Sequence, residues 1–242
     1  MKKNLSVVLA TKNEAENIGT CLKSVKGLAD EVIVIDEHST DKTREIAESF
    51  GVKVSLSPHE EIFHITKQKA IDKADGDWIL QLDADEAVSP ELKEEIKKII
   101  DSTNEQIKNR RLSSKKQSLF LRHQRLIEER DGFLGKKNGE IVAFFLPRRN
   151  IFLDKALTYG GVYPDGVIRL FKRGKAFLPC KSVHEQMVID GEVGWLENDL
   201  IHYSNPTLGK YFTHLNRYAN LMRDELSQKP PSSMIGATLD YL

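Results

Sequence analysis

Three acidic side chains, Asp83, Asp85 and Glu86, follow the apolar run Trp78–Leu82, and no basic residue lies among them. Carboxylates crowded at a strand end repel one another, and this repulsion is costly unless a cation neutralises it. Oxygen ligands of this kind suit Mg²⁺ or Mn²⁺, which keep coordination positions open for diphosphate oxygens. The acids could instead cap the next helix, but Pro90, which marks its start, follows too late for all three. The acidic run therefore predicts a divalent metal site.

Alternating strand and helix signals in the first hundred residues explain how these acids are positioned. Short apolar runs predict buried strands at 5–10, 31–36, 52–57 and 78–82. Apolar residues at helical spacing predict helices at 14–26, 42–50, 65–74 and 91–100. Strands joined through helices by short links imply a mainly parallel sheet with helices on both faces. Ligands bind such sheets beyond the carboxyl ends of the strands, where polar residues stand at 11–14, 36–39 and 83–86.

The rest of the chain divides by composition. Residues 102–138 are polar and basic, and we expect a linker or insertion there. Residues 139–228 are expected to hold strands at 142–146, 167–171 and 193–196, followed by a helix at 207–227. Two prolines end that helix, so residues 229–242 are predicted to form a flexible tail.

Bulk properties exclude several classes of protein. The 242 residues include 36 Lys+Arg and 36 Asp+Glu, so the net charge of zero gives no argument for a nucleic-acid partner. Cys21 and Cys180 have no CxxC spacing, which argues against a disulfide framework or a cysteine zinc site. No stretch approaches the ~20 apolar residues of a spanning helix. We therefore expect a cytoplasmic protein without a transmembrane segment.

Nine short segments carry a family resemblance. In order, they are TKNE at 11–14, VID at 34–36, STD at 39–41, GDW at 76–78, LDADE at 82–86, GGVYPD at 160–165, RLF at 169–171, VHE at 183–185 and HY at 202–203. Together they resemble the family 2 inverting glycosyltransferases, and most closely the lipopolysaccharide-core glucosyltransferase-like branch. The likeness covers about residues 4–101 and 139–222. It implies a GT-A (Rossmann-like) α/β fold, with a nucleotide-sugar-binding half in 1–101 and an acceptor-side subdomain with a C-terminal helix in 139–228.

The resemblance also implies which residues bind the donor nucleoside. Thr11, Asn13 and Glu14 would line the nucleoside pocket after the first strand. Asp36, at the end of the second strand, would accept a hydrogen bond from the base.

Diphosphate and metal are implied to lie beside the acidic run. Asp83 would face the ribose or diphosphate and share in the metal site, and Asp85 would ligate the metal. His202 stands where many GT-A enzymes have a late histidine near the metal or diphosphate. Arg169 and Lys67 could add positive charge that stabilises the leaving group.

The catalytic base is implied to be an acid in the second half of the chain. Glu185, in the VHE segment, stands at the position of the family's acidic base. Asp165 is the alternative base, although between Pro164 and Gly166 it could equally be a turn residue. Either carboxylate would take the proton of the acceptor hydroxyl as the new bond forms.

The expected function is the transfer of a sugar from a nucleoside diphosphate sugar, a UDP-sugar above all, to an acceptor hydroxyl with inversion. Mg²⁺ or Mn²⁺ would assist, and a glycan, lipid-linked or protein acceptor in lipopolysaccharide or cell-surface glycan synthesis would fit the resemblance. One alternative is a catalytically silent module that binds nucleotide sugars. A nucleotidyltransferase is a weaker alternative, because it calls for a glycine-rich loop after the first strand, and residues 11–14 contain no glycine.

A basic segment runs from Lys108 to Arg130. Leucines are interleaved with its arginines, so it predicts either a solvated helix or a surface that holds the enzyme peripherally at the inner face of a membrane. The basic residues that define the membrane hypothesis are Arg110, Arg111, Lys115 and Lys116. His123, within this segment, is expected to be solvated.

Overall fold

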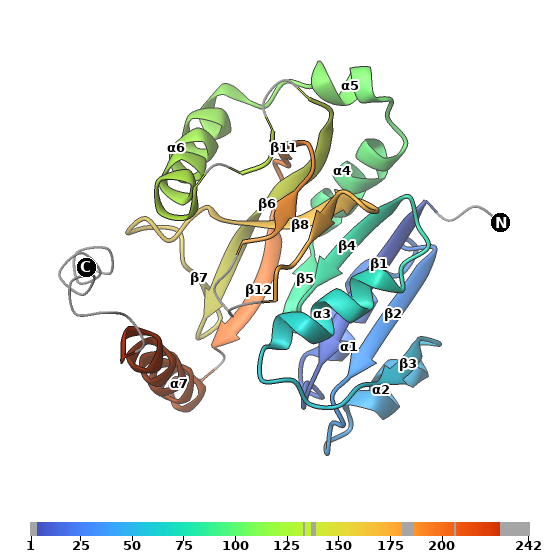
Figure 1. The fold of residues 1–242 in the computed structure, drawn as a ribbon, viewed down its shortest axis with the longest axis vertical. Coiled ribbons are helices and arrows are strands. Elements are labelled where there is room, and N and C mark those ends of the chain that lie inside the picture. The colour runs from blue at the N-terminus through green and yellow to red at the C-terminus, as the bar shows by residue number, and fades with distance from the viewer. Residues whose placement is uncertain (1–3, 133, 137–138, 181–185, 206, 228–242) are drawn as a thin grey trace.

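The computed structural model describes residues 4–132, 134–136, 139–180, 186–205 and 207–227 (Figure 1). Its first half is a parallel sheet in the order β3-β2-β1-β4, formed by β1 (Leu5–Thr11), β2 (Glu31–Asp36), β3 (Lys53–Leu56) and β4 (Trp78–Leu82). The helices between and after these strands are α1 (Ile18–Val25), α2 (Thr43–Ser49), α3 (Phe63–Asp72) and α4 (Pro90–Ile100). The predicted order of strands and helices in this half is confirmed, with shifts of a few residues at most ends.

Two hydrophobic cores lie on opposite faces of the sheet because side chains alternate along each strand. Leu5, Val7 and Leu9 of β1 pack with α1 and α4, whereas Val8 of the same strand packs with α3. Helices therefore cover both faces, as Figure 1 shows for α3 on the near side. This arrangement confirms the predicted α/β class and leaves the carboxyl ends of the strands free to build a site.

The second half extends the same sheet with mixed strand directions. β8 (Asp165–Lys172) is antiparallel to β4, and β6 (Ile141–Phe152) is antiparallel to β8. β12 (Leu200–Asn205) runs parallel to β6 and antiparallel to β5 (Glu86–Val88). Smaller strands are β7 (Lys155–Ala156) and β11 (Glu192–Trp195), which pair with β6, and the separate pair β9 (Ala176–Phe177) and β10 (Val188–Ile189). Neither β5 nor β12 was predicted, and β6 extends well beyond the predicted 142–146.

The basic segment contains α5 (Asn104–Lys108) and α6 (Ser114–Asp131). Phe120 of α6 is fully buried and stacks on Trp195 with ring centroids 4.4 Å apart. Arg110 donates to the Trp195 carbonyl at 2.6 Å and pairs with Glu95. Lys116 donates to the Glu197 carbonyl at 2.5 Å. Two of the basic residues assigned to a membrane surface thus donate hydrogen bonds to the protein's own backbone.

A C-terminal helix, α7 (Leu208–Ser227), follows β12, close to the predicted 207–227. The predicted tail at 229–242 lies outside the described residues. Among the helices of the described part, none combines the length and apolar character needed to cross a membrane.

Candidate active site

Asp83 joins two cations at the carboxyl end of β4. Its Oδ1 lies 2.5 Å from Nζ of Lys67 on α3, and its Oδ2 lies 2.5 Å from a guanidinium nitrogen of Arg169 on β8. Burial alone would raise the pKa of Asp83, but Arg169 and Lys67 hold it well below its ordinary value. Asp83 is therefore ionised, and it gathers the two positive side chains that the sequence associated with the diphosphate.

Glu86 forms the buried floor under this cluster. Its Oε2 accepts the Asp83 backbone N–H at 2.9 Å, and its Oε1 accepts from Arg169 at 2.8 Å. Gln81 completes the set, because its Oε1 accepts from the other terminal nitrogen of Arg169 at 2.5 Å. A buried charge is tolerated when it is paired and hydrogen-bonded, so these contacts explain how Arg169 can be buried.

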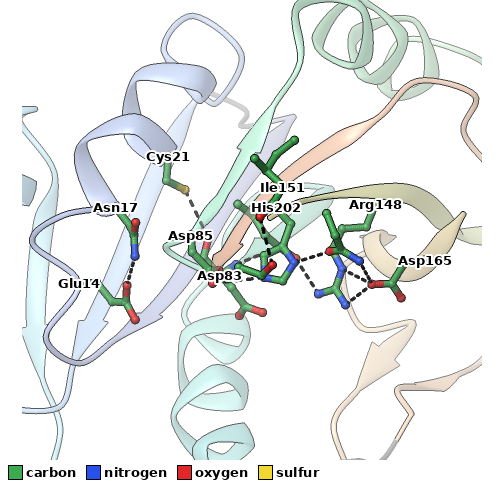
Figure 2. Close-up of polar contacts among 12 residues, drawn as sticks. Glu14, Asn17, Cys21, Asp83, Asp85, Arg148, Ile151, Asp165 and His202 are labelled. Atoms are coloured by element: carbon green, nitrogen blue, oxygen red, sulfur yellow. Dashed lines mark hydrogen bonds and ion pairs between the residues drawn. The ribbon is translucent and has the colours of Figure 1, made fainter. Parts of the chain in front are cut away.

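Asp85 faces His202 across the site. The Asp85 Oδ2 lies 3.2 Å from the Nε2 of His202 on β12. The backbone holds this approach, because His202 is the register partner of Glu86 and the Tyr203 N–H donates to the Asp85 carbonyl at 2.9 Å. Figure 2 shows Asp83, Asp85 and His202 gathered at the centre of the site. The structure thus brings together three of the residues that the resemblance associated with metal.

A hydrogen-bonded chain fixes which ring nitrogen of His202 donates to Asn150. Asn150 on β6 donates from Nδ2 to the Asp165 Oδ2 at 2.9 Å, which leaves its Oδ1 as an acceptor. That Oδ1 lies 2.6 Å from the His202 Nδ1, so Nδ1 carries the hydrogen. When the ring carries no second proton, Nε2 presents a lone pair to the Asp85 carboxylate. Two facing acceptors are satisfied by a cation shared between them, either a proton or a metal ion.

Asp165 itself is held in an ion pair. Arg148 donates to the Asp165 Oδ2 through Nε at 2.9 Å and through a terminal nitrogen at 2.6 Å. Burial raises the pKa of Asp165, but Arg148 and Asn150 outweigh it and hold the pKa below its ordinary value. The other predicted base, Glu185, lies outside the described residues.

His123 of α6 contacts the backbone beside Asp165, so the prediction that it is solvated was wrong. Its Nε2 accepts the Gly166 N–H at 3.0 Å, and its ring packs edge-on against Trp195. Gly166 has no room for a side chain, since an added Cβ would lie 2.4 Å from Trp195. The helix of the basic segment therefore supports the strand that carries Asp165.

The predicted nucleoside pocket lies at the ends of β1 and β2. Thr11 and Asp36 are register partners, and the Thr11 hydroxyl donates to the Asp36 Oδ2 at 2.9 Å. Ser39 also donates to Asp36, from its N–H at 2.7 Å and from its hydroxyl at 2.6 Å. Asn13 accepts the Thr40 N–H at 2.8 Å, which ties the two loops together. Asp36 is fully buried, so in this conformation it orders the pocket loops, and its contact with a base stays a prediction.

Glu14 lies between the nucleoside pocket and the acidic run. It accepts from Asn17 at 2.8 Å, and its backbone N–H donates to the Thr43 hydroxyl at 2.7 Å. Burial raises the pKa of Glu14, and the nearby charges of Asp85 and Asp83 raise it further. In Figure 2, Glu14 lies on one side of Asp83 and Asp85, and Arg148 with Asp165 lies on the other.

Sequence reasoning missed Arg148, Asn150 and the structural roles of Gln81 and His123. A signal was available for the first two, since Arg148-Arg149-Asn150 follows an apolar strand run after a single proline. Across the described parts of the chain, no group of three or more His, Cys, Asp or Glu side chains could hold a metal by itself. The arrangement suits a cation that takes Asp85 and His202 and receives its other ligands from a bound diphosphate and water.

Comparisons with known proteins find glycosyltransferases that are similar to this chain. An uncharacterized glycosyltransferase from Rickettsia bellii is 46% identical over 107 residues, which cover 43% of this chain and 35% of that protein. A lipopolysaccharide core biosynthesis glycosyltransferase from Rhizobium meliloti is 22% identical over 228 residues, covering 91% of this chain and 71% of that protein. The chain spans about a third of the length of the Rickettsia relatives that it matches.

Solved structures with local similarity include S. aureus TarS in complex with UDP-GlcNAc, with 28% identity and a TM-score of 0.37 over 40% of this chain and 31% of that one. Glucosyl-3-phosphoglycerate synthase from Mycobacterium tuberculosis, in complex with Mn²⁺ and UDP-glucose, is 27% identical with a TM-score of 0.32. The similarity covers 35% of this chain and 34% of that one. The model of glycosyl transferase family 2 matches residues 6–175, which is more than half of the chain. The protein is therefore a member of glycosyl transferase family 2, with the α/β fold expected of a GT-A glycosyltransferase.

Proposed function

We propose that the protein transfers a sugar from a nucleoside diphosphate sugar, a UDP-sugar by our expectation, to an acceptor hydroxyl with inversion and with help from a divalent metal. Membership of family 2 supports glycosyl transfer. The single observation that carries the metal-assisted reading is the contact of 3.2 Å between Asp85 and His202. It lies where ligands bind sheets of this kind, beyond the carboxyl end of β4.

Asp85 and His202 fit a hard divalent cation such as Mg²⁺ or Mn²⁺. Such ions are commonly held by one or two protein ligands together with substrate phosphates. Asn150 orients His202 so that its Nε2 lone pair is available, as is usual for metal-binding histidines. Asp83 would have to release Lys67 or Arg169 before it could join these ligands. When bound, the cation would stabilise charge on the departing diphosphate.

Lys67 and Arg169 are assigned to the diphosphate as well. Both side chains are almost fully buried, and each contacts a different carboxylate oxygen of Asp83. Fixed positive charge in a buried site stabilises developing negative charge more strongly than it would in water. A bound diphosphate would compete with Asp83 for Lys67, so donor binding would rearrange this pair.

We assign the general base to Glu185 and a positioning role to Asp165. A base with a depressed pKa has little tendency to take a proton, and Arg148 with Asn150 lowers the pKa of Asp165. The Asp165 carboxylate instead orients Asn150 and, through it, His202. Glu185 would take the proton from the acceptor hydroxyl as the sugar is transferred.

The relative from Rhizobium meliloti supports a role in lipopolysaccharide core or cell-surface glycan synthesis, since its similarity extends over 91% of this chain.

A lipid-linked acceptor would place the enzyme at a membrane surface. Two leucines and two arginines are exposed on α6, at Leu121, Arg122, Arg125 and Leu126. We assign peripheral contact with anionic lipid to this face. Liposome sedimentation tests this assignment. We expect the wild type to sediment with anionic but not with neutral liposomes, and the double variant Arg122→Gln/Arg125→Gln to lose this binding. Equal sedimentation of the wild type and the variant with anionic liposomes contradicts it.

The direct test of the function is nucleotide release. UDP-glucose, UDP-galactose and UDP-GlcNAc are incubated with the protein, Mn²⁺ or Mg²⁺, and lipopolysaccharide core oligosaccharides as acceptors. We expect acceptor-stimulated UDP release from at least one donor, and an inverted anomeric configuration of the product by proton NMR. Binding of a nucleotide sugar without any release would instead identify a silent binding module. Retention of configuration would overturn the single-displacement mechanism.

A further inference from the structure

Residues 157–164 form a loop whose two ends are both tied to Asn150. At its start, the Leu157 N–H donates to the Asn150 carbonyl at 2.9 Å. At its end, Asp165 accepts from the Asn150 side chain at 2.9 Å. Asn150 also contacts His202, so the base of the loop adjoins the candidate diphosphate site.

The C-terminal end of the loop is anchored a second time. The Tyr163 hydroxyl donates to the Asp199 Oδ1 at 2.7 Å, and Arg149 forms an ion pair with the same carboxylate. The Arg149 guanidinium also lies 6.0 Å from the centre of the Tyr163 ring. At the N-terminal end, β7 pairs with β6. These contacts fix where the loop leaves the sheet and where it returns.

The tip of the loop displays an aromatic ring. Tyr159 is 90% exposed, which is the largest exposed fraction of any exposed large hydrophobic side chain in the described residues. Gly160 and Gly161 follow it with φ of 74° and 81°, a backbone region that favours glycine. An added Cβ at either glycine would meet no atom within 4 Å. The glycines therefore set the direction of the chain at the loop tip and do not serve close packing.

The position of the loop favours a contact with the acceptor over a contact with the donor. In Figure 2, Asp165 lies on the side of Asp83 and Asp85 opposite to Glu14, which marks the predicted nucleoside pocket. A displacement with inversion requires the acceptor to approach the anomeric carbon from the side opposite to the departing nucleotide. Tyr159 lies two residues beyond Leu157, so its Cα is within about 7 Å of the Leu157 Cα at the loop base. The ring therefore belongs to a loop whose base lies on the acceptor side.

The geometry points to Tyr159 as a stacking platform for a pyranose ring of the acceptor, an inference that rests on the proposed glycosyl transfer. A pyranose presents one face of C–H bonds, which matches the flat apolar face of a tyrosine ring. Tyrosine combines an apolar body with a polar tip and is well suited to contacts that are partly wet. The platform would hold an acceptor sugar while its hydroxyl is presented to the base.

The first readout is kinetic and uses UDP release in the presence of glycoside acceptors. We expect Tyr159→Ala to raise the KM for the acceptor about three- to tenfold, the value of one stacking contact, and to change the KM for the nucleotide sugar much less. Tyr159→Phe, which keeps the ring, should restore the acceptor KM. Phe50→Ala is the matched control, because Phe50 is an exposed aromatic residue following α2, remote in the sheet order from this loop. An unchanged acceptor KM in Tyr159→Ala would overturn the inference.

The second readout does not depend on turnover. Saturation-transfer NMR is recorded on the whole protein with methyl β-glucopyranoside or methyl β-galactopyranoside, and with sorbitol as the open-chain control. We expect transfer to the ring C–H protons of the glycosides, little to sorbitol, and loss of most of the transfer in Tyr159→Ala. Equal transfer in both proteins overturns the platform even if the enzyme turns over. Absence of nucleotide release from the wild type would instead overturn the proposed function. Weaker binding of Tyr159→Ala to neutral liposomes, with glycoside signals unchanged, would assign the loop to a membrane and not to a sugar.

Discussion

The Nε2 of His202 lies 3.2 Å from the Oδ2 of Asp85, although 117 positions separate the two residues in the chain (202 − 85). The approach depends on β12 running antiparallel to β5, with His202 paired to Glu86 in the register. Asn150 holds the opposite side of the imidazole at 2.6 Å. Two strands and one amide thus bring the imidazole and the carboxylate to the same point, where we propose that they share a cation.

Asn150 should control metal affinity without touching the metal. In Asn150→Ala the His202 ring loses the acceptor that fixes its orientation, so we expect Mn²⁺ affinity in the presence of UDP to fall about 10- to 100-fold. Titration followed by electron paramagnetic resonance of free Mn²⁺ measures it. Asn109→Ala, at an exposed helix end, is the control and should bind as the wild type does. Wild-type affinity in Asn150→Ala would remove the proposed role of this side chain.

The two acids assigned to different roles should separate kinetically. Glu185→Gln keeps the size of the side chain but cannot take a proton, so transfer should fall by the ~10²–10⁴ of a lost general base while donor binding survives. Asp165→Asn should weaken metal binding, because Asp165 orients Asn150 and thereby His202. Single-turnover rates and Mn²⁺ titrations of both variants distinguish these effects. If Asp165→Asn loses the transfer step alone and Glu185→Gln retains it, the two assignments are exchanged.

The first half of the fold could be predicted because its signals are local. β1, β2 and β4 are mostly apolar runs, β3 alternates apolar and polar residues, and a helical pattern follows each strand, so the order implies a parallel sheet. β12 is a different case, since it contains His202, Tyr203 and Ser204 and is defined by pairing with β5 and β6. Pairing between strands distant in the chain leaves no hydrophobic periodicity in the sequence of β12 or β5. The contact between His202 and Asp85 could therefore be expected only from the family resemblance.

The same reasoning explains why the buried anchors of the basic segment were not foreseen. Its polar composition hides two buried anchors, Phe120 and Ile127, that pack against the face of the sheet opposite to α1. Arg110 and Lys116 look solvated in sequence, yet both donate to backbone carbonyls of the second half. Long basic side chains can bury their stems and still satisfy their charged ends, which composition alone does not reveal.

His123 should make stability depend on pH. Burial holds the pKa of His123 below its ordinary value, and its Nε2 must stay unprotonated to accept the Gly166 N–H. The native state then binds fewer protons than the unfolded state. The stabilising contribution is therefore complete above the ordinary histidine pKa of about 6.5 and is lost as the pH falls through the lower native pKa.

The control for this effect is His123→Gln, whose amide oxygen can accept the same N–H without titrating. Free energies of unfolding in urea are measured for both proteins between pH 8 and pH 5. We expect the wild type to lose stability relative to His123→Gln as the pH falls. Parallel curves over the whole range would show that the native pKa of His123 is not depressed.

The central claim is that Asp85, with His202, holds the divalent metal that transfer requires. UDP release from the best donor is measured with Mn²⁺ and with EDTA, for the wild type, Asp85→Asn and the exposed control Asp101→Asn. The account predicts that EDTA abolishes release by the wild type, that Asp101→Asn behaves as the wild type, and that Asp85→Asn with Mn²⁺ falls at least ~10²-fold, as expected when electrostatic stabilisation of the leaving group is lost. Near-wild-type release by Asp85→Asn, or release by the wild type that EDTA leaves unchanged, would contradict it.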